Sequence, residues 1–130
     1  MSERLRVFGA DSINLREIRN FITAAAVQDS FSGILSDILI GVSEACANAI
    51  TYSGGAQVRL AWRAERDEVT ITVEDDGVFR PVTGIPELDG RAHRGIHLMT
   101  ASMDRVEIEP GTREAPGTRV TLSKRKAVRV

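Results

Sequence analysis

The chain has 130 residues, 42% hydrophobic and 27% charged, which suits one domain with a single core. Its net charge of −1 gives no electrostatic basis for binding nucleic acid or an anionic membrane. One cysteine, Cys46, excludes an internal disulfide and a multi-cysteine metal site. The N-terminus lacks an apolar signal region and no apolar run approaches roughly 18 residues, so we expect a soluble, cytoplasmic protein.

The first part of the chain predicts a strand and then a helix. Residues 4–8, RLRVF, alternate as a short strand does. Asp11 or Ser12 is the expected N-cap of a helix that runs to about residue 28. The apolar stripe expected on this helix consists of Ile13, Ile18, Phe21, Ile22 and Ala25.

A second helix is expected over residues 34–52, ending at the Ser-Gly-Gly of 53–55. Its expected apolar stripe consists of Ile34, Ile38, Val42, Ala45 and Ala49. Two alternating strands, 56–65 and 68–75, follow and predict a hairpin that buries one face.

The second half of the chain is less regular. Residues 76–94 are rich in glycine and proline, and a loop of that length in a small domain is usually functional or mobile. A short helix is expected at 95–102, before a closing hairpin that turns around 111–117. This order predicts one α+β domain over 1–130, a two-layer sandwich with helices on one face of a mixed, mainly antiparallel sheet. The basic residues of 124–130 are expected to form a solvated tail.

Two polar residues interrupt the second helix, although its neighbouring residues are small and apolar. Glu44 and Asn48 lie four apart, on one face with Asp37 and Gly41. Burying a carboxylate or a carboxamide without a partner is costly. The face therefore either bonds to neighbouring loops or holds a ligand, and Gly41 would allow something to approach the backbone closely.

Two further pairs of residues have both a structural and a functional interpretation, and a third position is noted beside them. Asp75 and Gly77 end a strand, either as an ordinary turn or as an acceptor for an exocyclic amine beside a glycine that admits a flat ring. Arg94 and Gly95 precede a helix, which is either a plain junction or an anion site. Thr118 follows a glycine at a strand start and is unremarkable alone.

Taken together and in this order, these elements resemble the GHKL (Bergerat-fold) ATP-binding superfamily. The segments ILIGVSEACANAI, VTITVEDDGVFRP and RGIHLMTASMDRVEIEPGTREAPGTRVTL are similar to its anti-sigma factor serine/threonine-protein kinase branch. The resemblance covers about residues 3–124 and implies a histidine kinase-like ATPase domain whose ATP lid is about 78–94.

The resemblance also implies a role for each site residue. Glu44 would be the catalytic base, and Asn48 would bind the Mg²⁺ that bridges the ATP phosphates. Asp75 would accept from the adenine amino group, and Gly77 would let the ring approach. The phosphates would contact Arg94 and Gly95, and the adenine would lie near Thr118.

The partners that the resemblance implies are an anti-anti-sigma (STAS) protein, phosphorylated on serine or threonine, and a sigma factor that the chain sequesters. Transcription would be controlled without direct contact to nucleic acid or membrane. A homodimer is also suggested, with the first strand or the first helix as its surface.

The sequence departs from the family pattern in the lid. Phe79 and His93 stand where relatives often have glycine, and the alternative is a catalytically weak or inactive interaction module that sequesters a partner. The catalytic domain of a histidine kinase is a third, less favoured alternative. His93 and His97 are four apart, but no third ligand is evident, so a zinc site is not expected.

Overall fold

The computed structural model describes residues 2–53, 56–77 and 95–126. Its strands are β1 (Ser2–Gly9), β2 (Gln57–Ala64), β3 (Glu68–Asp75), β4 (Arg105–Glu109) and β5 (Thr118–Arg125). Its helices are α1 (Leu15–Gln28), α2 (Leu35–Asn48) and a short helix at 95–102. Short 3₁₀ turns, Ser12–Asn14 and Ser32–Ile34, precede α1 and α2, and a π-helical turn, Ala49–Ser53, extends α2. These elements occur in the predicted order.

The strands form one sheet in the order β1-β2-β3-β5-β4. Each neighbouring pair is antiparallel. The prediction of a mainly antiparallel sheet is confirmed, but the prediction that the sheet is mixed is wrong for the described strands, because none of them pairs in parallel. The two predicted hairpins are β2–β3 and β4–β5. The last strand thus lies between β3 and β4.

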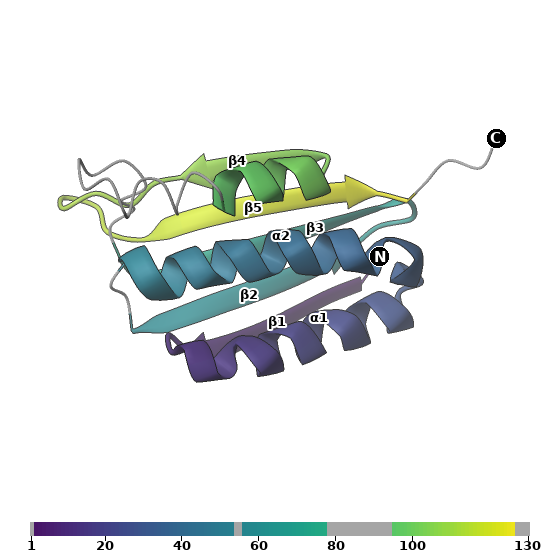
Figure 1. Ribbon diagram of the computed structural model, residues 1–130, viewed down its shortest axis with the longest axis horizontal. Helices are drawn as coiled ribbons and strands as arrows, with labels where there is room; N and C mark the ends of the chain where they lie inside the picture. The colour runs from purple at the N-terminus through teal and green to yellow at the C-terminus, as the bar shows by residue number, and fades with distance from the viewer. Residues whose placement is uncertain (1, 54–55, 78–94, 127–130) are drawn as a thin grey trace.

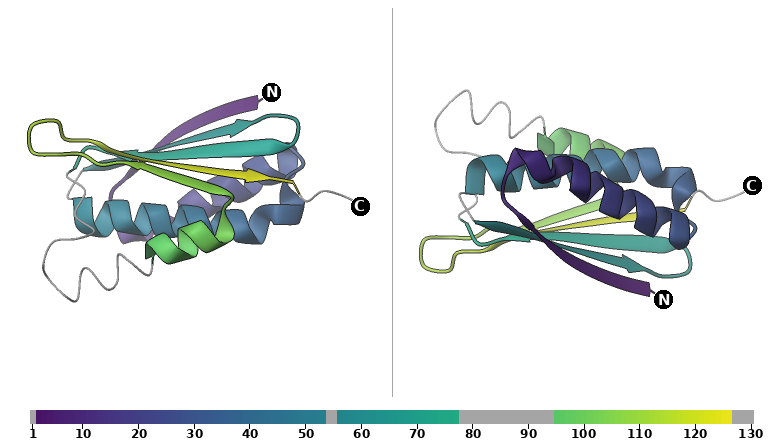
Figure 2. Two further views of the ribbon diagram at one scale, coloured as in Figure 1. Left: turned by 90° about the horizontal axis from the view of Figure 1, so that it is seen from above. Right: turned by 90° about the horizontal axis from the view of Figure 1, so that it is seen from below.

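The helices cover one face of the sheet, and Figure 2 shows the two layers edge-on. Along β2 and β3 every second side chain is apolar and points toward the helices. Trp62, Leu60, Ile71 and Val73 are buried there against Ile22, Ile38 and Val42. The predicted α+β two-layer sandwich is confirmed. The short helix at 95–102 lies beside α2 over β4 and β5 (Figure 1).

Two details of the predicted fold are wrong. Ile13 is 78% exposed because it lies in the 3₁₀ turn before α1, where three residues per turn rotate it away from the stripe of Ile18 and Ile22. The solvated tail was predicted to begin at residue 124, which is too early. Lys124 and Arg125 are the last residues of β5, and the Lys126 N–H donates to the Asp67 carbonyl.

A polar cluster joins β1 to the turn between α1 and α2. The Asp29 carboxylate, only 12% exposed, accepts from Arg4 at 3.0 Å and from the Trp62 indole at 2.8 Å. Burial alone would raise the pKa of the Asp29 carboxyl, but the hydrogen bond from Trp62 and then the hydrogen bond and charge of Arg4 hold that pKa below its usual value. Phe31 packs edge-to-face on Trp62 beside this cluster.

By length and composition alone, the segment Ser32–Thr51 is apolar enough to cross a membrane. In the fold this segment is the central helix, and its apolar side packs on the sheet. Its buried residues include Ile38, Val42, Ala45 and Cys46. Packing within the domain therefore accounts for its hydropathy.

Candidate functional site

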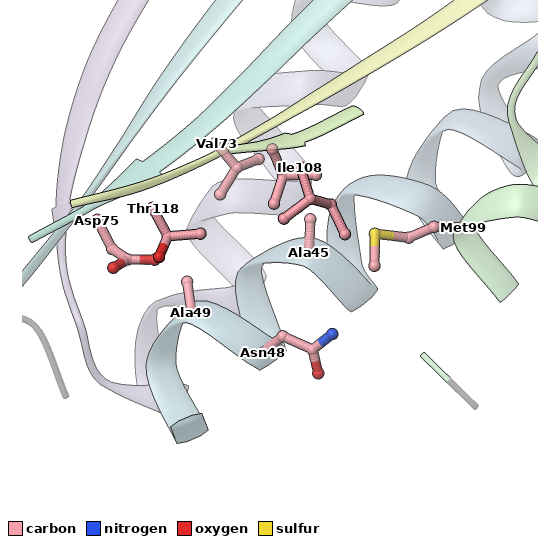
Figure 3. Close-up of a pocket in the computed structure, with 9 residues that line it drawn as sticks. Ala45, Asn48, Ala49, Val73, Asp75, Met99, Ile108 and Thr118 are labelled. Carbon is pink, nitrogen blue, oxygen red and sulfur yellow. The ribbon is translucent and has the colours of Figure 1, made fainter. Parts of the chain in front are cut away.

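A pocket lies between α2 and the sheet, where β3 ends and β5 begins. The helix at 95–102 forms another of its sides. Its lining residues come from α2 and its extension, three strands and that helix (Figure 3): Ala45, Asn48, Ala49, Val73, Asp75, Met99, Ile108, Thr118 and Val120. Asp75 and Thr118 lie together at its sheet side, while the Asn48 side chain on α2 points away from them. The pocket therefore has an inner polar end and a separate polar rim.

The inner end is set by the pairing of β3 with β5. Asp75 and Thr118 are directly opposite each other in this register, and both are buried. The Gly77 N–H donates to Asp75 Oδ1 at 2.8 Å, which fixes the carboxylate in an Asx turn. The Thr118 hydroxyl accepts from the Gly111 N–H at 3.0 Å and donates to the Gly77 carbonyl at 3.5 Å. A carboxylate held in this way can accept from a ligand amine.

Gly111 is essential to this end of the pocket, and the sequence analysis missed it. A Cβ at Gly111 would overlap the Gly77 carbonyl oxygen and lie 2.6 Å from the Gly117 nitrogen. The sequence feature that could have indicated Gly111 is the tripeptide Pro-Gly-Thr, which occurs at 110–112 and again at 116–118. Gly117 has φ +118°, which disfavours any side chain, and its N–H donates to the Gly77 carbonyl at 2.9 Å.

The rim lies beside Asn48, where the polar face of α2 meets the start of the helix at 95–102. Asn48 lines the pocket itself, whereas Glu44 lines a separate surface hollow next to it. Glu44 and Asn48, one turn apart, are both partly buried. A Cβ at Gly95 would lie 3.1 Å from Glu44 Oε2 and 3.1 Å from Asn48 Nδ2. Glycine at 95 thus lets a helix start sit directly on these two side chains, and its N-terminal dipole favours an anion there.

The other two residues on the predicted polar face have structural roles. Gly41 accommodates Met103, whose Cγ would lie 2.7 Å from a Cβ at this position. The close approach that Gly41 was expected to allow is therefore made by a side chain of the chain itself. Asp37 forms an ion pair with Lys124 at 3.3 Å.

The predicted site residues fall into two groups that the structure describes and one residue outside it. Glu44, Asn48 and Gly95 meet at the rim, and Asp75, Gly77 and Thr118 meet at the inner end. Arg94 and the lid residues 78–94 lie outside the described residues. Met99 and Ile108 line the pocket without having been predicted, because an apolar wall has no sequence motif.

The pocket is nearly closed as it stands. Its cavity is about 10 Å³, room for about one water molecule, whereas ligand pockets are typically about 300–1,000 Å³. Met99, fully buried, fills the side under the short helix. Methionine is unbranched and flexible. A planar ligand can therefore displace the Met99 side chain more easily than it could displace a β-branched side chain at this position.

The donor set at the rim fits a cation that arrives with its own ligands. Among the described residues, no group of three His, Cys, Asp or Glu side chains is placed to hold a metal. Mg²⁺ commonly takes one or two protein oxygens and completes its shell with water and phosphate, and the Asn48 carboxamide beside Glu44 suits that role. Cys46 is buried, which raises the pKa of its thiol to about 12, so it is a core residue and no thiolate ligand.

The pocket thus lies between a helix and an antiparallel sheet, with a buried carboxylate, Asp75, at its inner end and a helix N-terminus beside its rim. The family described as a histidine kinase-like ATPase domain matches residues 8–124. The chain belongs to this family, and its fold is that of the GHKL ATPases.

Solved structures that share the fold include the following two. The chain aligns with the structure described as the RsbU and RsbW domains of Rv1364c from Mycobacterium tuberculosis, with TM-score 0.69 and 18% identity. That alignment covers 96% of this chain and 32% of the solved one, so this chain spans about a third of the length of the solved chain. The Acinetobacter baumannii histidine kinase AdeS aligns with TM-score 0.53 and 10% identity, over 96% of this chain and 68% of that one. No curated protein sequence matches the chain.

Proposed function

We propose that the chain is a cytoplasmic anti-sigma factor that uses Mg-ATP to phosphorylate serine or threonine of an anti-anti-sigma (STAS) partner. The observation that carries this proposal is the meeting of Glu44, Asn48 and Gly95 at the rim of a pocket whose inner end is Asp75. A domain that only sequestered a partner would not need a carboxylate at that place. The likeness of its fold to a chain that contains an RsbW domain is consistent with this branch of the family.

Each side chain then has a chemical task. Asp75 accepts from the adenine amino group, and Asn48 helps to hold Mg²⁺, which supplies charge neutralisation when bound. Glu44 takes the proton of the partner's hydroxyl as its oxygen forms a bond to the γ-phosphorus and the bond from that phosphorus to ADP breaks. The helix start at Gly95 stabilises phosphate charge. Transcription would be regulated by release of a sequestered sigma factor.

The kinase activity is tested by Glu44→Gln, which keeps the shape of the side chain and removes its basicity. We expect Mg-ADP to bind this variant as it binds the wild type, and phosphate transfer to fall about 100-fold or more. Binding is measured by calorimetric titration with and without Mg²⁺. Transfer is measured with γ-labelled ATP and the small STAS proteins of the same organism, with the phosphorylated residue located by mass spectrometry.

The control is Glu107→Gln, the same change on β4, which should leave both measurements unaltered. Transfer by Glu44→Gln at the wild-type rate would remove Glu44 from the mechanism. A wild type that binds no nucleotide at millimolar concentration would instead favour the second candidate, a sequestering module without catalysis. The nearly closed pocket and the departures at Phe79 and His93 are what support that candidate.

We also propose that two copies form a homodimer through the outer face of the sheet at β1. Leu5 and Val7 are 71% and 53% exposed. They alternate along β1 with Phe8, which is buried in the core, so they lie on the opposite face, the one that the helices leave uncovered (Figure 2). We expect Leu5→Glu to dissociate the dimer, because it places a charge within an apolar contact, and sedimentation velocity measures the change. Ile13→Glu, at an equally exposed apolar residue away from the sheet, is the control. Identical sedimentation of Leu5→Glu and the wild type would contradict the proposed surface.

A further inference from the structure

The helix at 95–102 determines the shape of the site at three points. Gly95, at one end, lies on Glu44 and Asn48. Met99, in the middle, lines the pocket. Met103, just after the helix, packs on Gly41 of α2. Any shift of this helix along α2 therefore moves both the rim and one wall of the pocket.

The C-terminal end of the same helix is held by one partly buried lysine. The Lys124 ammonium donates to the Ser102 carbonyl at 2.8 Å and forms ion pairs with Asp37 at 3.3 Å and Asp104 at 3.9 Å. Its side chain is 14% exposed, so water screens these interactions only in part. A cation at the last carbonyls of a helix also stabilises the helix dipole. Lys124 thus joins α2, β5 and the short helix.

Asp104 strengthens the same junction from the other side. Its N–H donates to the Ser123 carbonyl at 2.9 Å, and its Oδ2 accepts from the Arg125 N–H at 2.7 Å. Both partners neighbour Lys124 in β5. The end of the helix that lies away from the rim is therefore anchored on the sheet by charge and by hydrogen bonds.

We propose that Lys124 is a positioning residue for the nucleotide site, which it does not touch. It fixes where the short helix lies on α2, and through that helix it sets Gly95 over Glu44 and Asn48 and Met99 in the pocket. This inference rests on the proposed function for its effect on nucleotide. Without the ammonium, the Ser102 carbonyl loses its donor, and the carboxylates of Asp37 and Asp104 are left without the cation between them.

The test compares Lys124→Met with Lys126→Met, the only other lysine in the chain. Both substitutions remove one positive charge and keep most of the side-chain volume. The Lys126 ammonium lies 4.5 Å from the Phe31 ring, at the turn before α2 and not on the short helix. This pair therefore separates a change in charge or in general stability from a change at the short helix.

Two readouts are needed, and the first requires no nucleotide. In the ligand-free protein we expect amide hydrogen exchange within 96–103 to become at least about 10-fold faster in Lys124→Met and to stay unchanged in Lys126→Met. In calorimetric titration with Mg-ADP, well below the unfolding temperature of either variant, we expect Lys124→Met to bind about 10-fold or more weakly. Lys126→Met should stay within about twofold of the wild type.

Unchanged exchange at 96–103 in Lys124→Met overturns the inference, whatever the nucleotide measurements give. Equal losses of Mg-ADP affinity in the two variants overturn it as well, because they would report general destabilisation. A wild type that does not bind Mg-ADP refutes the proposed function and the effect on affinity together, while the exchange measurement still decides whether Lys124 holds the helix. Should Lys124→Met fail to fold, Lys124→Gln takes its place. Because its amide can still donate to the Ser102 carbonyl and only the charge is lost, we expect a smaller change, at least about threefold faster exchange at 96–103, and unchanged exchange there overturns the inference.

Discussion

Asp75→Asn is expected to lower the affinity for Mg-ADP by about 100-fold. A hydrogen bond to a charged acceptor contributes about 1.5–3 kcal/mol, and the carboxamide can present an N–H₂ group toward the adenine amino group, so that two donors face each other. The variant should still fold, because an asparagine oxygen can accept from the Gly77 N–H as Asp75 Oδ1 does. Calorimetric titration measures the affinity, and the melting temperature checks the fold.

A second nucleotide makes this prediction specific to the base. Inosine diphosphate has a carbonyl oxygen where adenine has its amino group, so it suits a carboxamide donor and meets a carboxylate unfavourably. We expect the preference for ADP over inosine diphosphate to shrink or reverse in Asp75→Asn. Equal losses of affinity for both nucleotides would mean that Asp75 supports the structure of the pocket without contacting the amino group of the base.

Asp29→Ala is expected to destabilise the domain by about 3 kcal/mol. The substitution leaves the Trp62 indole N–H and the Arg4 guanidinium without their acceptor in a largely buried place, and removal of one partner of a buried pair is costly. Urea unfolding measures the loss of unfolding free energy. It is monitored by the fluorescence of Trp62, which is the only tryptophan in the chain. The control is Asp76→Ala, which removes an exposed ion pair of similar length, 2.9 Å to Arg59, and should cost less than about 1 kcal/mol.

The Asp29 contribution should also depend on pH in a defined direction. Its pKa is lower in the folded chain than the ordinary value of 3.8, so the folded state favours the carboxylate. The stability it provides is fully present above the pKa of the unfolded chain and is lost as the pH falls through the folded pKa. The gap in unfolding free energy between wild type and Asp29→Ala should therefore be constant near neutral pH and narrow below about pH 4. A gap that widens in acid would contradict the assignment.

Local sequence patterns were sufficient for most of the fold. The alternation of Val58, Leu60 and Trp62, and of Val69, Ile71 and Val73, predicts a hairpin with one buried face, which the structure has. The errors arose where local geometry overrides periodicity. Ile13 fits the helical stripe by spacing, but a 3₁₀ turn shifts it to the surface.

The site was predictable where its residues lie in short motifs. Glu44 and Asn48 share a helix face by their spacing, and Asp75 and Gly77 form a turn within three residues. The proposed role of Lys124 could not be recognised from the sequence. It depends on the contacts of Lys124 with Asp37 and Ser102, which are close to it in space but far from it in the sequence. A basic residue near the end of a chain has the same local pattern whether it is solvated or ties elements together.

The place of β5 between β3 and β4 has a consequence for how the protein is made. On a ribosome, β4 and the short helix emerge before the only described strand with which β4 pairs. A nascent or truncated chain that ends before residue 118 would still contain α1, α2 and the β2–β3 hairpin. It would lack Thr118, Val120 and the lysine that anchors the short helix, and hence one side of the pocket. The proposed nucleotide site would thus be complete only once β5 has been translated, and a nucleotide bound there would favour chains that contain β5 over chains that lack it by mass action.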